Sequence, residues 1–72
     1  MPPSDLTETE AAVLRTVHAQ DVLDLYDLSQ AVGTGPRAVQ EAVQGLAQRD
    51  FVHVAGRRVR CTQTGARWVQ QQ

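Results

Sequence analysis

The sequence has 72 residues, of which 42% are hydrophobic and 21% charged, and a net charge of −1. This composition is typical of one small globular domain and argues against a disordered chain. No apolar run approaches the roughly 18 residues of a membrane span, and Met1–Asp5 lacks the basic-then-apolar order of a signal peptide. The single cysteine, Cys61, excludes an internal disulfide. We therefore expect a cytoplasmic binding module rather than an enzyme.

The first predicted helix spans about residues 7–19. Thr7 and Glu10 have the spacing of a capping box, in which each side chain satisfies a backbone N–H of the other residue. Apolar residues then recur at helical spacing. We expect residues 1–5 to be flexible, residues 6–70 to form the domain and residues 71–72 to fray.

Two shorter helices follow, and their spacing predicts a helix-turn-helix. We expect residues 20–24 to be a connection, with Leu25 a short extended residue that points inward. Asp24 is suited to cap a helix that Gly33 ends in a left-handed conformation. Pro36 fits the first turn of the next helix, predicted over residues 36–49, because its missing N–H costs nothing there. A turn of about three residues between two helices is typical of this motif.

The end of the chain changes to a period of two residues. If Gly56–Arg57 is a two-residue hairpin loop with glycine first, as a type II′ turn requires, the pairing of the two strands is fixed. Val54 then faces Val59 and Val52 faces Cys61, with these four residues on one face of the hairpin. Thr62 is suited to cap a last helix that contains Ala66, Trp68 and Val69.

Several segments resemble the winged helix-turn-helix domain of bacterial transcriptional regulators of the MarR class. The segment Leu6–Leu14 resembles their first helix, and Asp27–Gly33 resembles their scaffold helix. The segment from Gly35-Pro36-Arg37 to Val52 resembles their recognition helix and its exit into the wing, and Thr62-Gln63-Thr64-Gly65 is similar to the signature that follows the wing. The match covers about residues 5–70. It implies an α+β fold of three helices, a two-stranded wing and a C-terminal helix.

The sequence departs from that pattern at four points. Gly35 stands where the family usually has a serine or threonine, so Thr34 would have to supply the capping hydroxyl. Gly45 lies inside the recognition helix, at a cost of about 1 kcal/mol relative to alanine. Asp50 replaces the usual glycine at the exit of that helix. The 72 residues also hold no counterpart of the long flanking helices through which MarR-class regulators dimerise.

The resemblance implies that the helix over residues 36–49 enters the major groove of double-stranded DNA. Arg37 is suited to form paired hydrogen bonds with guanine, and Gln40 or Gln44 to form them with adenine. Glu41 could accept a hydrogen bond from cytosine. The alternative is that the glutamines and Glu41 only solvate the helix. The residues predicted to contact DNA in this segment are Thr34, Pro36, Arg37, Ala38, Gln40, Glu41 and Gln44.

The charge distribution points to the hairpin as a second DNA contact. Residues 1–48 have a net charge of −5 and residues 49–72 a net charge of +4, and every basic residue is an arginine. Arg57, Arg58 and Arg60 concentrate three charges on the predicted wing, where they would meet phosphates or the minor groove. Alternatively, such charges protect an edge strand from aggregation, and all-arginine usage reflects a GC-rich genome.

The sequence predicts no catalytic residue, metal site or cofactor. His18 and His53 lie far apart in the chain, and Cys61 is expected in the core. The predicted function is sequence-specific DNA binding in transcriptional regulation. The alternatives are a winged helix that binds protein through an acidic surface and an accessory protein of phage or plasmid type.

The terminal segments supply the apolar residues for self-association. We expect Trp68 to pack on the first helix, or else to be half of an interface. A homodimer through the terminal helices would use Leu6, Ala66, Trp68 and Val69, together with Val22–Leu23.

Overall fold

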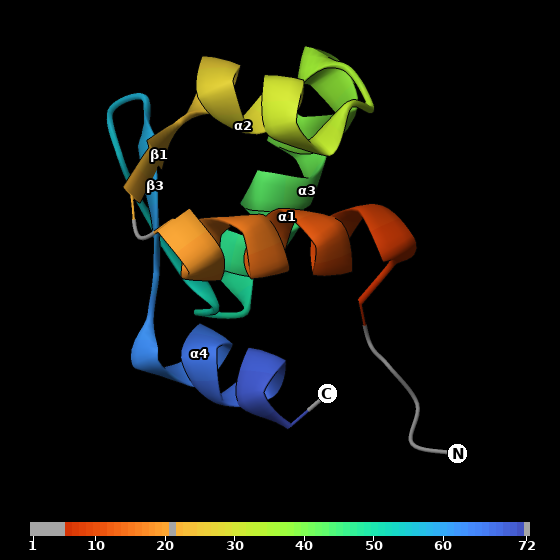
Figure 1. Cartoon of the computed structure of the whole chain (residues 1–72). Coiled ribbons are helices and arrows are strands. Elements are labelled where there is room, and N and C mark those ends of the chain that lie inside the picture. Colours follow the sequence, from red (N-terminus) through yellow and green to blue (C-terminus); the bar gives the residue numbers. More distant parts are fainter. Residues whose placement is uncertain (1–5, 21, 72) are drawn as a thin grey trace.

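The computed structural model describes residues 6–20 and 22–71, with the backbone alone for Val22 and Leu23. Within this part, four helices and a three-stranded sheet form an α+β fold. The fold is a winged helix, which confirms the predicted fold class (Figure 1). In chain order the elements are α1 (Glu8–Gln20), β1 (Val22–Asp24), α2 (Leu25–Val32), α3 (Pro36–Gln48), β2 (Val52–Ala55), β3 (Arg58–Cys61) and α4 (Gln63–Gln70). The predicted flexible segment 1–5 and the terminal Gln72 lie outside the described residues.

The helix boundaries follow from local capping, as predicted. The Thr7 amide donates to Glu10 Oε1 at 2.9 Å and the Glu10 amide to Thr7 Oγ1 at 3.1 Å, which is the expected capping box at the start of α1. Asp24 caps α2 by accepting from the Tyr26 amide at 2.8 Å. Gly33 ends α2 with a φ of 79°, and Pro36 opens α3.

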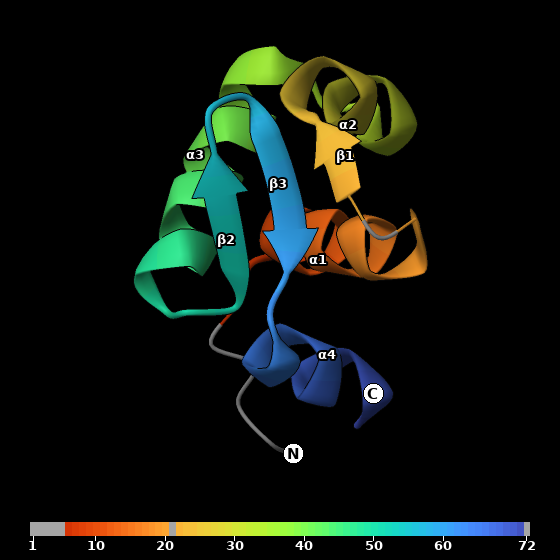
Figure 2. The ribbon, with the colours of Figure 1, turned by 90° about the vertical axis from the view of Figure 1, so that its left-hand side faces the viewer.

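One prediction for the segment before α2 is wrong. Residues 22–24 are not part of a plain connection, and Leu25 is not extended: Val22–Asp24 form β1, and Leu25 is the first residue of α2. The strand β1 pairs antiparallel with β3, so that β3 is the central strand of the sheet (Figure 2). Three residues are too few to show an alternating pattern, and their partner lies more than thirty residues further along the chain.

The wing hairpin has the predicted register. Val52 pairs with Cys61, His53 with Arg60, Val54 with Val59 and Ala55 with Arg58. Gly56 has a φ of 63°, as expected for glycine at the first position of the loop. The inner face is not covered evenly, however, because Val59 is fully buried whereas Val54 is 37% exposed.

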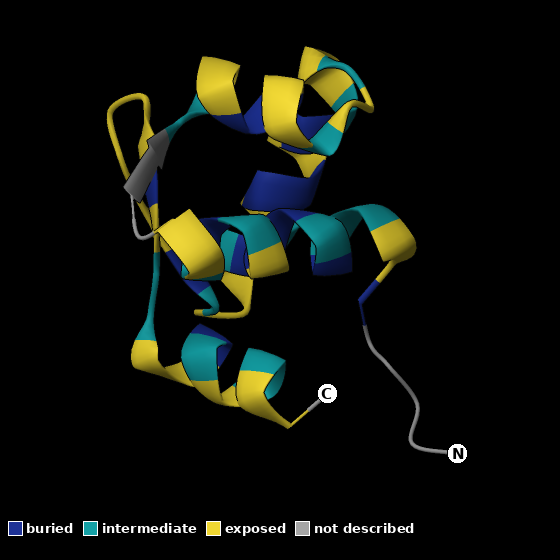
Figure 3. Cartoon of the chain, in the orientation of Figure 1, coloured by how far each residue is buried: buried dark blue, intermediate teal, exposed yellow. Residues whose placement is uncertain are grey.

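The core lies between the helices and the inner face of the sheet (Figure 3). Its largest fully buried side chains are Leu14, Leu28, Leu46, Val13, Val17, Val39 and Val59. The helix α3 buries one face against α1 and α2 and leaves its opposite face in solvent. The core therefore holds α3 with a polar face turned outward, next to the wing.

Thr62 and Gly65 join α4 to the segment that leaves α3. The Thr62 amide donates to Phe51 O at 3.0 Å, and its hydroxyl donates to Asp50 O while accepting from the Gly65 amide at 3.1 Å. A Cβ on Gly65 would overlap the Phe51 carbonyl oxygen. The threonine-and-glycine signature therefore links α4 to the exit of α3. Because Gly65 has no side chain, α4 can lie close to the Phe51 carbonyl.

Candidate nucleic-acid interface

The outward face of α3 has two flanks with different neighbours. Arg37, Gln40, Glu41 and Gln44 are exposed, and Ala38 is half-buried. Glu41 and Ala38 line a pocket of about 350 Å³ whose other side is the start of α1, with Thr7, Thr9 and Glu10. The glutamines lie on the other flank, toward the wing. The predicted contacts on α3 share one exposed face, and Glu41 is the one that lies at its edge beside the acidic end of α1.

The turn before α3 differs from the expectation for Thr34. The residue at the N-cap is Gly35, with a φ of 92°, and no side chain makes a capping hydrogen bond there. Thr34 and Pro36 are exposed, but Thr34 does not replace the missing hydroxyl. Glycine is favoured at this position because L side chains rarely adopt such a φ. The first turn of α3 thus presents backbone N–H groups that no described side chain caps.

The tip of the wing is tied to the start of α2. The Leu25 amide donates to the Arg57 carbonyl oxygen at 2.9 Å, which extends the pairing of β1 and β3 to the hairpin loop. The Arg57 side chain is 79% exposed and lies 3.9 Å from the Asp24 carboxylate. An exposed ion pair of this kind contributes little to stability. Asp24 therefore places a negative charge beside the wing tip, a neighbour that sequence spacing did not reveal.

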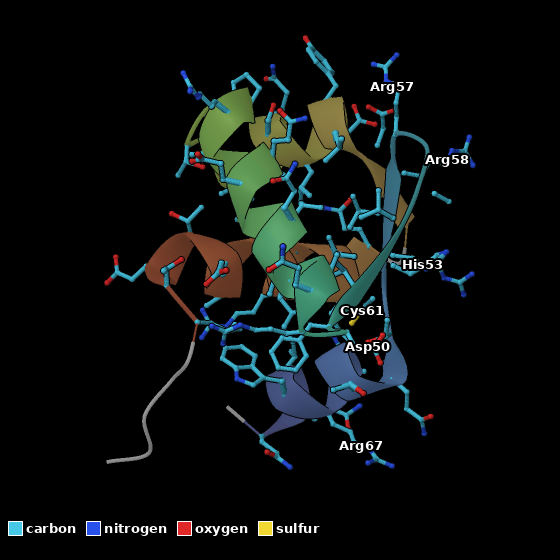
Figure 4. The ribbon with its side chains drawn as sticks, turned by 180° about the vertical axis from the view of Figure 1, so that it is seen from behind. Asp50, His53, Arg57, Arg58, Cys61 and Arg67 are labelled. Atoms are coloured by element: carbon cyan, nitrogen blue, oxygen red, sulfur yellow. The ribbon has the colours of Figure 1, made fainter. Side chains whose placement is uncertain are left out.

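The outer face of the sheet carries the other wing arginines. Arg58 and Arg60 are exposed and share this face with Ala55 and His53, their register partners. Figure 4 shows Arg57, Arg58 and His53 projecting from the hairpin, and Arg67 at the opposite end of the molecule on α4. The structure therefore brings the three predicted wing arginines together on one hairpin, with His53 as an additional neighbour.

A groove separates α3 from the wing; we call it the α3–wing groove. It has a volume of about 400 Å³ and is lined by Gln40, Gln44 and Gln48 of α3 and by the apolar side chains of Val43, Ala47 and Val54. None of the eight described residues that line it carries a charge. Val54 is thus an inward-facing residue that the chain's own core leaves partly uncovered. Neither Gln48 nor Val54 was among the predicted site residues.

The described residues offer no sign of reactive or metal chemistry. No group of three or more His, Cys, Asp or Glu within them is placed to hold a metal ion. Cys61 is half-buried, and burial raises the pKa of its thiol, which therefore stays protonated at neutral pH. Among the helices described, none is long and apolar enough to cross a membrane.

Of the terminal apolar residues that are described, fewer are available to a partner chain than the sequence predicted. Leu6 is only 7% exposed and belongs to the core, so it is not free for a partner. Trp68 and Val69 are half-buried against the same core, as expected for packing on α1. The Arg15 guanidinium lies 5.9 Å from the centre of the Trp68 ring. The side chains of Val22 and Leu23 lie outside the described part.

Comparison with known proteins gives the class of the fold. No family model and no curated protein matches the sequence. Among solved structures, BpsR of Bordetella bronchiseptica, whose DNA binding is regulated by 6-hydroxynicotinic acid, is 26% identical with a TM-score of 0.92, covering 99% of this chain and 55% of BpsR. The chain has a MarR-like winged-helix domain.

Two further neighbours are described as transcription regulators. MepR, which regulates the Staphylococcus aureus multidrug efflux pump MepA, is 20% identical with a TM-score of 0.83, covering 93% of this chain and 54% of MepR. The MarR family regulator SPO1453 of Silicibacter pomeroyi is 22% identical with a TM-score of 0.78, covering 88% of this chain and 48% of SPO1453. The chain spans about half the length of these proteins.

Proposed function

We propose that this chain binds double-stranded DNA sequence-specifically and acts in transcriptional regulation. Two neighbouring features carry this proposal. The helix α3 has an outward-facing polar side and no side-chain cap at its N-terminus, and the hairpin beside it bears three arginines. The MarR-like fold and the regulated DNA binding of BpsR support it. In this arrangement α3 enters the major groove and the wing lies on the backbone or in the adjacent minor groove.

Each predicted contact has a chemical role in the proposed complex. Thr34 and Ala38 lie at the start of α3, where unpaired backbone N–H groups favour a phosphate. Pro36, which has no N–H, would contact the strand only through its ring. Arg37 takes guanine, and Gln40 or Gln44 takes adenine. Glu41 would accept from cytosine, although its place beside Glu10 makes it the weakest of these contacts. Arg57, Arg58 and Arg60 meet phosphates.

A gel-shift experiment on genomic fragments across a salt series tests the function. A DNA-binding protein retains fragments at low salt and loses affinity steeply as salt rises, because each neutralised phosphate releases counterions. A protein that retains no fragment even at low salt would instead be a protein-binding winged helix, with its acidic α1–α2 surface as the candidate contact.

Replacement of Arg37 tests the base-reading role of α3. Arg37→Ala is expected to cost roughly 1–3 kcal/mol on the preferred site and to relax the preference at one base pair. Arg37 is exposed, so the variant should fold normally. Titration of specific and random duplexes measures the effect. Equal losses on both duplexes would make Arg37 a phosphate contact instead.

We also propose a homodimer through the terminal helices. One recognition helix and one wing give a small footprint, and two copies would place their recognition helices about 34 Å apart, one turn of DNA. With Leu6 in the core, the candidate contact is the exposed part of α4 around Trp68 and Val69. Sedimentation at micromolar concentration, with and without a palindromic duplex, should give a dimer. A 7.9 kDa species throughout, with one protein per duplex, would contradict it.

A further inference from the structure

The start of α1 holds a carboxylate against the edge of α3 that faces α1. Glu10 Oε1 accepts from the Thr7 amide at 2.9 Å, so the capping box fixes the orientation of this side chain. A Cβ on Gly45 would overlap the other oxygen, Glu10 Oε2, so the glycine leaves the space that the carboxylate occupies. Glycine weakens a helix relative to alanine, and the room for Glu10 is what the structure gains in return.

Glu41 lies on the same edge of α3, one turn before Gly45. The side chains of Glu41 and Glu10 line one pocket, whose α3 wall is completed by Ala38 and Ala42. Glu41 is exposed, and within the described part of the chain neither glutamate forms an ion pair with a basic side chain. Like charges on the walls of one pocket repel each other. The fixed carboxylate of Glu10 therefore drives the Glu41 side chain away from α1 and toward the middle of the exposed face of α3.

We propose that Glu41 determines DNA specificity by exclusion and that Glu10 is its positioning residue. This inference rests on the proposed function and gives Glu41 a discriminating role in place of a weak attractive one. An ionised carboxylate only accepts hydrogen bonds. In the major groove guanine and thymine offer it only acceptors, adenine offers one donor and one acceptor, and cytosine offers a donor. A duplex that brings guanine, thymine or a phosphate to Glu41 is repelled, whereas one that brings cytosine is not.

Exclusion of this kind complements the arginines of the wing. Arg57, Arg58 and Arg60 attract the phosphates of any duplex, so they raise affinity without selecting a sequence. A carboxylate beside the bases lowers the affinity for incorrect duplexes more than that for the correct one, and a difference of affinities is what specificity requires. The negative charge on α3 thus has a use in a DNA-binding protein that attraction alone does not explain.

Selection of bound duplexes from a random-sequence pool, followed by sequencing, tests the role of Glu41. The unmodified chain should deplete guanine and thymine at the position that Glu41 faces. In Glu41→Gln both bases should return at that position, and affinity for the unselected pool should rise about fivefold or more, because a like charge no longer faces the duplex. Glu41→Ala should give the same gain, which attributes the effect to the lost charge and not to a new amide contact.

Replacement of Glu10 tests the positioning role. Glu10→Gln removes the charge but keeps an oxygen that accepts from the Thr7 amide, so the capping box is retained. It should relax the preference at the same position in part, and should add nothing in the Glu41→Gln background, because Glu10 acts through Glu41. A purely structural role would not change a base preference.

Glu8→Gln is the matched control. Glu8 is exposed in the same first turn of α1 but does not line the pocket. Its replacement removes one negative charge as well, and should leave the base preferences unchanged and the affinity for the pool within about twofold. Thermal unfolding followed by circular dichroism confirms that each variant is folded.

The possible failures are distinguishable. If the unmodified chain retains no duplex at low salt, the proposed function is wrong and this inference falls with it. If the chain binds DNA but the Glu41 variants still deplete guanine and thymine, or lose affinity for the preferred site without gaining any on the pool, exclusion by Glu41 is wrong. If Glu10→Gln behaves as Glu8→Gln does, the positioning role of Glu10 is wrong.

Discussion

Replacing Arg57, Arg58 and Arg60 together with alanine is expected to weaken binding to all DNA sequences alike. These side chains are exposed on one hairpin, and the proposed complex places each of them on a phosphate. Each lost phosphate contact removes close to one unit from the slope of log affinity against log salt concentration, so the slope should fall by up to about 3 units. Gel shifts of one specific and one random duplex across a salt series measure both effects.

The control for the wing variant is an arginine outside the proposed interface. Arg67 is exposed on α4, at the end of the molecule opposite the wing tip (Figure 4). Arg67→Ala should leave the slope nearly unchanged, since it neutralises no phosphate in the proposed complex. A triple variant whose slope equals that of the unmodified chain would remove the wing from the interface.

Gly65→Ala is expected to destabilise the folded chain by about 3 kcal/mol, the upper end of the usual cost of overpacking. The added Cβ would overlap a backbone oxygen, Phe51 O, which cannot turn away as a side chain can. Moving that oxygen also breaks its hydrogen bond with the Thr62 amide. A domain of this size is stable by roughly 4–11 kcal/mol, so the loss is a large fraction of the whole. Urea unfolding followed by circular dichroism measures it.

The glycine inside α3 provides the comparison for Gly65. A Cβ on Gly45 would meet the carboxylate of Glu10, which is the far end of a flexible side chain. Alanine gains about 1 kcal/mol of helix propensity there, against about 1 kcal/mol for a weakened hydrogen bond between Glu10 and the Thr7 amide. The free energy of unfolding of Gly45→Ala should therefore lie within about 1 kcal/mol of that of the unmodified chain. Equal stability of the two variants would contradict the structural role assigned to Gly65.

Local signals explain which parts of the fold could be predicted. Capping residues such as Thr7 and Gly33 act on their own helix, and a two-residue loop at Gly56 fixes the register of its own hairpin. The strand β1 depends on pairing with β3, a segment distant in the sequence, and was missed. Asp50 adopts a φ of 64° at the position that the resemblance gives to glycine. Aspartate is among the residues that tolerate this conformation best, so the backbone of the helix exit is retained with a different residue.

The candidate site could be predicted only in part. The residue types and their order indicated α3 and the wing, because arginines and glutamines at helical and hairpin positions are visible in the chain. The division of α3 into a flank beside Glu10 and a flank beside Val54 depends on how α1 and the wing pack against it. The contact of Arg57 with Asp24 likewise requires β1 to lie beside β3. Such neighbours arise from tertiary packing, which spacing in a single sequence does not contain.

The hydrogen bond between the Leu25 amide and the Arg57 carbonyl has a consequence for the shape of the DNA. It anchors the hairpin loop to the beginning of the helix-turn-helix, so the separation between α3 and the wing tip is set by the protein. In the proposed complex, a duplex whose groove widths do not match that separation has to bend or change its minor-groove width. The energy of such a deformation depends on the base-pair steps being deformed. Base pairs that no side chain touches would then influence affinity through their stiffness.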